Sequence, residues 1–285
     1  MQNKIRPKPE WLRKKISLSI NKELDSLFIR SGVSTVCKEA MCPNISECFS
    51  QKQASFLILG TICTRSCSFC AVDKGLPKPL DENEPHNVAQ AVKLLELKHV
   101  VITSPTRDDL DDGGAKHYCK TVNAIKSIND SVVVELLIPD MQEDIETLKK
   151  IANCGAEIIG HNLETVPRLY HIRKGANYKR SLRVLKKLSA FNPLIATKSG
   201  IMLGLGETDE EIQTLMQDLL DAECRYLSIG QYLAPSNHHE SVVEYVKPKR
   251  FELLKELGMK MGFNHIQSSP YTRSSYMAHE YLEKR

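Results

Sequence analysis

The chain has 285 residues, of which 41% are hydrophobic and 26% are charged, and its net charge is +4. This is the composition of a globular protein with enough apolar residues for a full core. Because Lys and Arg are interleaved with Asp and Glu, we expect solvated charges and no nucleic-acid partner, the alternative being a basic patch for an acidic protein. No apolar run reaches the roughly 18 residues of a membrane helix, and the N-terminus lacks the apolar core of a secretory signal. We therefore expect a cytoplasmic protein that does not bind a membrane.

Short apolar segments alternate with amphipathic helical segments along the chain. Strands are predicted at residues 56–60, 99–103, 132–138, 157–161, 194–203 and 225–232, and helices at residues 87–97, 115–128, 141–153, 177–190, 208–221 and 249–261. Six strand–helix repeats imply parallel strands joined by right-handed crossovers. They fit a doubly wound α/β sheet or an incomplete barrel, and are too few for a closed eight-stranded barrel. In such folds, function is expected on the loops after the strand C-termini.

Nine cysteines are present, and six of them fall into two compact groups. Thiols stay reduced in the cytoplasm, and an odd number of cysteines fits a disulfide framework poorly. The grouped cysteines are therefore predicted to bind metal or to act in catalysis. Cys119, Cys154 and Cys224 lie singly on or just after predicted helices, where cysteine behaves as a small apolar residue, and we expect them in the core.

The first group follows directly after the first predicted strand and consists of Cys63, Cys67 and Cys70, a C-x3-C-x2-C spacing. Three thiolates on one short loop can bind three irons of a cubane cluster, which leaves the fourth iron open for a small molecule. The alternatives are a group of core cysteines and a zinc knuckle, but zinc sites usually show paired C-x2-C arms with four ligands.

The second group consists of Cys37, Cys42 and Cys48, a C-x4-C-x5-C spacing. It again offers three thiolates, too widely spaced for one arm of a zinc ribbon. Near the other end of the chain stands Arg273-Ser274-Ser275-Tyr276, in which the serines alone would be interpreted as capping a turn.

The first triplet, with Phe69 before its last cysteine, resembles the radical S-adenosylmethionine (SAM) superfamily. This resemblance implies that the open iron chelates the amino and carboxylate groups of SAM and that one electron cleaves the sulfonium to give a 5′-deoxyadenosyl radical. The cofactor carries such chemistry, and the protein positions and shields it. Two features depart from the wider superfamily: Thr103-Ser104-Pro105 replaces a Gly-Gly-Glu, and Met202 replaces an isoleucine in the fifth strand.

The two triplets together with the C-terminal tetrapeptide resemble lipoyl synthases, and the resemblance covers most of the chain. It includes the segments at 8–12, 106–114, 161–167, 198–207 and 230–233. It implies an auxiliary [4Fe-4S] cluster bound by Cys37, Cys42, Cys48 and Ser275, besides the SAM-binding [4Fe-4S] cluster on Cys63, Cys67 and Cys70. It also implies an incomplete (β/α)6 barrel at residues 55–262, closed by an N-terminal extension (1–54) and a C-terminal extension (263–285).

The implied activity is the insertion of two sulfur atoms, at C6 and C8, into an octanoyl chain on a lysine of a lipoyl carrier domain. Implied partners are 2-oxoacid dehydrogenase E2 subunits, the glycine cleavage H protein, an electron donor such as flavodoxin or ferredoxin, and an iron–sulfur carrier that rebuilds the auxiliary cluster. No acid–base residue is required. Further SAM contacts are expected from Phe69, Asn162, Glu164 and Lys198.

Two other functions remain open from the sequence. One is another radical SAM enzyme with an extra cluster, of the biotin synthase or methylthiotransferase kind, although no RNA-binding module is found. The other is a non-catalytic cluster carrier or zinc-binding protein, which metal analysis would distinguish.

Overall fold

The computed structural model describes residues 7–13, 28, 30–39, 42, 44–50 and 53–275. An eight-stranded sheet has the strand order β1-β2-β5-β6-β7-β8-β9-β10. β1 is antiparallel to β2, and all other neighbours are parallel. The strands are β1 (Ser34–Thr35), β2 (Gln53–Leu57), β5 (His99–Thr103), β6 (Val133–Leu137), β7 (Ile158–Gly160), β8 (Ala196–Leu203), β9 (Tyr226–Gln231) and β10 (His265–Ser268), while β3 (Ile62–Cys63) and β4 (Asp73–Lys74) form a separate pair.

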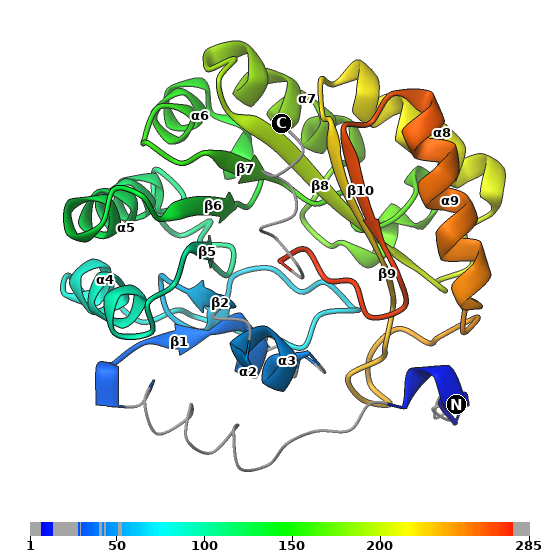
Figure 1. The fold of residues 1–285 in the computed structure, drawn as a ribbon, viewed down its shortest axis with the longest axis horizontal. Helices are drawn as coiled ribbons and strands as arrows, with labels where there is room; N and C mark the ends of the chain where they lie inside the picture. Colours follow the sequence, from blue (N-terminus) through cyan, green and yellow to red (C-terminus); the bar gives the residue numbers. More distant parts are fainter. Residues whose placement is uncertain are drawn as a thin grey trace.

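The longer helices cover the outer face of the curved sheet (Figure 1). They are α4 (Glu84–Leu94), α5 (Ala115–Ile128), α6 (Ile145–Ala152), α7 (Tyr178–Phe191), α8 (Asp209–Asp221) and α9 (Pro248–Met261). The short helices α2 (Val36–Glu39) and α3 (Ile45–Ser50) pack beside β2, and η1 (Glu10–Leu12), η2 (Met141–Glu143) and η3 (Pro167–Ile172) are 3-10 turns. Since the long helices lie on one face, the sheet is an open partial barrel and not a doubly wound sheet.

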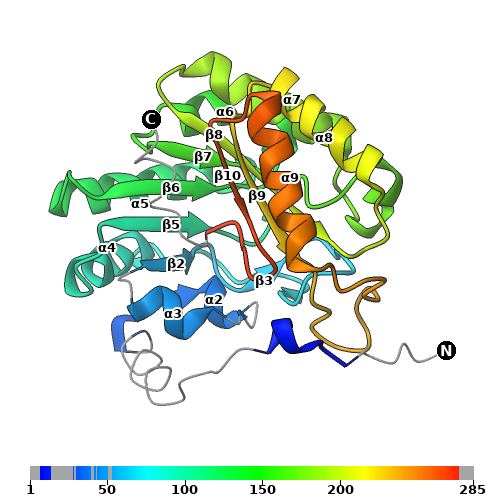
Figure 2. The ribbon, with the colours of Figure 1, turned by 45° about the vertical axis from the view of Figure 1, so that its right-hand side comes forward.

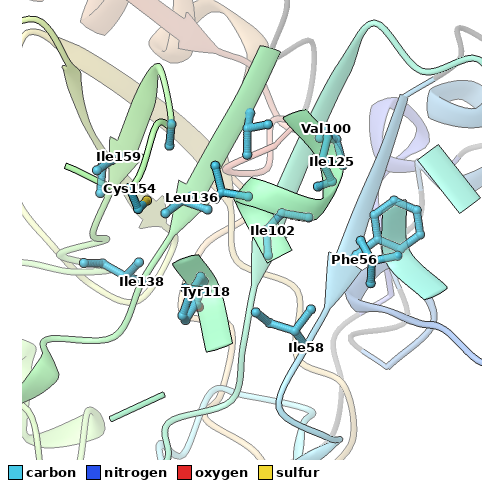
Figure 3. Close-up of a cluster of buried hydrophobic side chains, with 14 of the residues drawn as sticks. Phe56, Ile58, Val100, Ile102, Tyr118, Ile125, Leu136, Ile138, Cys154 and Ile159 are labelled. Atoms are coloured by element: carbon cyan, nitrogen blue, oxygen red, sulfur yellow. The ribbon is translucent and has the colours of Figure 1, made fainter. Parts of the chain in front are cut away.

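Strand alternation divides the side chains between the two faces of the sheet. Phe56, Ile102 and Leu136 point toward the helices and pack with Tyr118 and Ile125 of α5 (Figure 3). Their neighbours in the strands therefore face the inside of the barrel. Ser55, Val101, Thr103 and Leu137 all line cavities there. The apolar core thus lies outside the sheet, which leaves the inner face free to carry polar groups.

All six predicted strands and all six predicted helices are present. Their ends differ where the backbone takes left-handed values. β2 ends earlier than expected because Leu59 and Gly60 have φ of 68° and 85°. Met141, Gln142 and Glu143 also have positive φ, so α6 begins only at Ile145, after Asp144 accepts a hydrogen bond from Thr147 N. α8 begins as predicted, with a capping box between Thr208 and Glu211.

The main addition is β10, a parallel strand on the far side of β9. It lies within the segment predicted as a C-terminal extension. After β10 the chain turns back toward α2 and α3, which precede the strand at the opposite edge of the parallel sheet (Figure 2). Cys154 and Cys224 are buried in the core and Cys119 packs against it, as predicted. Among the described residues, none of the helices has the length and apolarity needed to cross a membrane.

Candidate active site

Cys63, Cys67 and Cys70 line one cavity at the C-terminal ends of the strands, here called the loop cavity. Phe69 lines it as well, together with Asn162, Glu164 and Arg173 from the loops after β7. Burial raises the pKa of the Cys67 thiol, and it raises that of Cys70 to about 11. A positively charged partner would favour the ionised form of these two thiols.

Arg65 fixes the loop that carries these three cysteines. Its guanidinium donates to Asp108 at 2.7 and 2.8 Å and to Asp140 at 2.7 and 2.9 Å. Asp140 is fully buried, which would raise its pKa, but the hydrogen bonds and charge of Arg65 lower that pKa to about 2. Asp108, from the charged segment 106–112, thus pairs with the cysteine loop.

His239, from the loop after β9, contacts the far end of the cysteine loop. Its Nε2 donates to the backbone oxygen of Cys70 at 3.1 Å, while Nδ1 bonds Ser236 Oγ at 2.8 Å. No sequence pattern connects this histidine with the cysteines, because the contact spans 169 residues.

Cys37, Cys42 and Cys48 line a second, smaller cavity, and Ser275 lines it with them. We call it the terminal cavity, because it joins residues from both ends of the chain. Asn44 Nδ2 donates to Tyr271 O at 2.6 Å and so connects the two segments directly. Burial, and then the charges of Cys42 and Cys48, raise the pKa of Cys37 to about 12. Tyr276, the last residue of the tetrapeptide, lies outside the described residues.

Two glycines make room for the C-terminal segment over the sheet. A Cβ on Gly230 of β9 would lie 2.0 Å from Thr272 O, and one on Gly200 of β8 would lie 3.1 Å from Ser274 Oγ. Both distances are shorter than ordinary contacts, and at Gly230 the contact is with backbone, so only glycine allows that approach. The backbone of Gln231 also donates to Pro270 O at 3.3 Å.

A third cavity of about 220 Å³, the central cavity, lies between the other two. It shares Asn162 and Glu164 with the loop cavity and Cys37, Cys42 and Ser275 with the terminal cavity. Much of its remaining wall is apolar, from Val36, Val101, Leu137, Ile201 and Met202. The central cavity therefore adjoins the cavities of both cysteine triplets.

Glu164 is held in a strained conformation at the junction of the loop and central cavities. It has φ of 65°. Its backbone N donates to Gly200 O at 2.9 Å, and its backbone O accepts from Met202 N at 2.8 Å. Such left-handed conformations in residues other than glycine tend to occur at functional sites. Burial raises the pKa of Glu164, while the charge of Arg173 and a hydrogen bond from Asn162 oppose that rise.

Arg173 was missed by sequence reasoning. It donates to Asn162 O at 2.9 Å, and its guanidinium stacks over the Tyr170 ring with 5.3 Å to the centroid. Arg173 follows a 3-10 turn, and nothing local distinguishes it from its neighbours Arg168 and Lys174.

Lys198 was expected to contact SAM, but the structure places it elsewhere. Its side chain is 2% exposed, and Nζ lies 2.8 Å from Glu135 Oε1 inside the barrel. It is absent from the residues that line the three cavities. The strand does point this side chain inward, but Glu135 on β6 pairs with its charge, and we leave Lys198 out of the proposed SAM contacts.

The residues present fit two cubane clusters. All nine cysteines are free thiols, and the two triplets line separate cavities. Among the described residues, no three His, Cys, Asp or Glu side chains are arranged to hold a single metal ion. In a cubane each thiolate binds a different iron, so its thiols stand further apart than ligands of one zinc ion.

Comparison with known proteins agrees with this geometry. The sequence profile of the Radical SAM superfamily matches residues 57–219. Lipoyl synthase of Geobacter sulfurreducens is 57% identical over 277 residues, covering 97% of this chain and 91% of that protein. Lipoyl synthase of Citrifermentans bemidjiense is 54% identical over 278 residues, covering 98% of this chain and 96% of that protein.

The chain belongs to the lipoyl synthase family. Solved structures of much lower sequence identity share its fold. Methylornithine synthase (PylB) superposes with a TM-score of 0.57 at 18% identity, over 70% of this chain and 61% of that chain. HydG, a maturase of the [FeFe]-hydrogenase, superposes with a TM-score of 0.57 at 14% identity, over 74% of this chain and 50% of that chain. As a lipoyl synthase family member, the chain is a radical SAM enzyme that uses SAM and two [4Fe-4S] clusters.

Proposed function

We propose that this chain inserts sulfur at C6 and C8 of an octanoyl chain carried on a lysine of a lipoyl domain. In this proposal Cys63, Cys67 and Cys70 bind the cluster that cleaves SAM. The auxiliary cluster is bound by residues of the two extensions, 1–54 and 263–285, namely Cys37, Cys42, Cys48 and Ser275. The observation that carries the proposal is the central cavity, which is lined by Cys37, Cys42 and Ser275 and shares Asn162 and Glu164 with the cavity of the other cysteine triplet.

When bound, the first cluster supplies the electron that splits SAM, and the auxiliary cluster supplies the sulfur atoms. The residues of the chain position the reactants and exclude water. Three thiols in the loop cavity leave one iron position without a protein ligand, which SAM can occupy. Asn162, Glu164 and Arg173 offer polar groups to the rest of SAM, with Phe69 beside them.

The apolar wall of the central cavity suits an alkyl chain. Val101, Leu137 and Ile201 can bury its methylene groups, each worth about 0.8 kcal/mol. They also keep water away from a radical that would otherwise react with any nearby group. A radical route needs no acid–base residue, and Glu164 is assigned to binding.

The carrier substrates are octanoylated lipoyl domains. We propose that these are 2-oxoacid dehydrogenase E2 subunits and the glycine cleavage H protein, met in the cytoplasm, where the six grouped thiols stay reduced. An electron donor such as flavodoxin or ferredoxin would reduce the first cluster. An iron–sulfur carrier would restore the auxiliary cluster after it has given up its sulfur.

The test is a pair of substitutions in protein loaded with iron and sulfide under anaerobic conditions. Cys67→Ala should abolish formation of 5′-deoxyadenosine from SAM. Cys42→Ala should retain SAM cleavage but yield no thiolated or lipoyl product from an octanoyl-lysine peptide. Both variants should fall from about eight irons per chain to about four.

Cys119→Ala is the matched control, because Cys119 is half-buried and packs against the core away from both cavities. It should retain about eight irons and normal product. Normal lipoyl product from Cys42→Ala would contradict the assigned division of labour between the two clusters.

A further inference from the structure

Ser274 is a polar residue of the central cavity to which the proposed ligand sets give no role. Its Oγ accepts a hydrogen bond from Asn162 Nδ2 at 2.6 Å, and the same amide group donates to Glu164 Oε1 at 3.0 Å. Asn162 and Glu164 both line the loop cavity, where SAM is expected. Ser275, the proposed ligand in the terminal cavity, is the next residue in the chain. One amide group therefore connects the two halves of the site.

The hydrogen bond from Asn162 holds the end of the described C-terminal segment against the barrel. Earlier in the chain, the segment also contacts the body of the protein at Pro270, Tyr271 and Thr272. Within the described part of the chain, the bond from Asn162 is the side-chain hydrogen bond that joins residues 274–275 to the loops of the barrel. The position of Ser275 relative to the loop cavity therefore depends on it.

The absence of a side chain at Gly200 allows Asn162 and Ser274 to lie this close together over β8. A Cβ at Gly200 would lie 2.8 Å from Asn162 Oδ1 and 3.1 Å from Ser274 Oγ. The first distance is shorter than real Cβ contacts, so the pair can sit over β8 only because position 200 has no side chain. A substitution there would move Asn162 or Ser274 without removing either hydrogen-bonding group.

We propose that Ser274 is a positioning residue that, through Asn162, sets where the sulfur-donating side of the site lies relative to SAM. The proposal rests on the proposed function. The adenosyl radical abstracts hydrogen productively only when the alkyl chain lies at a fixed place between the two sides. Loss of the Ser274 hydroxyl should loosen that geometry, so that SAM is still cleaved but fewer cleavage events take hydrogen from the substrate.

The experiment compares loaded variants in single-turnover reactions with a peptide bearing a perdeuterated octanoyl-lysine. The readout is the fraction of 5′-deoxyadenosine that carries deuterium. In Ser274→Ala we expect this fraction to fall about fivefold, the change that corresponds to one hydrogen bond, while total SAM cleavage stays within about twofold. Ser274→Thr keeps the hydroxyl and should restore the fraction.

Ser269→Ala is the matched control. Ser269 lies in the same segment, and its hydroxyl bonds Thr272 Oγ1 at 2.9 Å without contacting Asn162. This variant should transfer deuterium as the wild type does. If Ser274→Ala matched the wild type, or if Ser269→Ala were equally impaired, the proposal would be overturned.

A second variant covers the case in which Ser274→Ala fails to fold or to hold about eight irons. Gly200→Ala leaves every hydroxyl in place and separates Asn162 from Ser274, so it should lower the deuterium fraction in the same way. Normal transfer in that variant would refute the positioning role. Failure of the proposed function is distinct, because the wild type itself would then yield no lipoyl product.

Discussion

His161 is held neutral inside the protein, beside the loop cavity. Its Nδ1 donates to Ile138 O at 2.9 Å, and Nε2 lies 2.9 Å from Ser181 Oγ, from which it accepts. Burial, and then the charge of Arg173, lower its pKa from 6.5 to about 4. Between pH 6.5 and pH 4, the unfolded chain therefore binds a proton at His161 that the folded chain does not bind. The contribution of neutral His161 to the free energy of unfolding is therefore complete above pH 6.5 and is lost as the pH falls toward 4. The total loss is about 3 kcal/mol.

We predict that the free energy of unfolding, measured with urea, drops by about 1 kcal/mol between pH 7.5 and pH 5.5 because of His161 alone. His161→Gln should show a smaller drop over that interval. His86→Gln, at an exposed position, should keep the full dependence. An unchanged pH dependence in His161→Gln would show that other groups are responsible.

At the scale of helices and strands, the sequence predicted the features that depend on neighbouring residues in the chain. The 3.6-residue period located α5 and α8, and the spacing of Cys63, Cys67 and Cys70 located their loop after β2. β10 was missed because His265–Ser268 is short and has only one large apolar residue, Ile266. Its position as a strand comes from pairing with β9, which is a long-range contact. The role of Gly230 was hidden for the same reason, since Thr272 meets it only in the folded chain.

Gly230→Ala should displace the C-terminal segment from the sheet, because the added Cβ would lie 2.0 Å from a backbone oxygen. We predict that the variant keeps SAM cleavage but holds its auxiliary cluster poorly, so that iron falls toward about four per chain. Iron analysis with Mössbauer spectra measures this. Gly160→Ala on β7 is the control, because its Cβ would meet neighbours at 3.4 to 3.6 Å. Equal cluster loss in both variants would argue against a specific packing of the C-terminal segment on Gly230.

At the scale of the whole molecule, the proposed auxiliary cluster would fasten the two ends of the chain to each other. Cys37, Cys42 and Cys48 precede the partial barrel, while Ser275 follows its last strand. Asn44 and Tyr271, which are 227 residues apart, also join these two segments directly by a hydrogen bond. Metal binding that joins such segments contributes directly to folding free energy. A single sequence shows the ligands but not that they converge, because convergence depends on the order of the strands.

Removing the clusters should therefore expose the N-terminal segment before it affects the barrel. Lys38 lies between two proposed ligands and is exposed, so trypsin can attack it once the segment is released. We predict that cleavage after Lys38 accelerates at least about tenfold in chelator-treated protein and in Cys42→Ala, as for a site protected by about 1.4 kcal/mol or more of cluster binding. Cleavage after Lys174, an exposed residue next to the loop cavity, should be unchanged in Cys42→Ala, because that variant keeps the first cluster. Equal acceleration at both sites would mean that the auxiliary cluster stabilises the whole barrel and not the junction of its two ends.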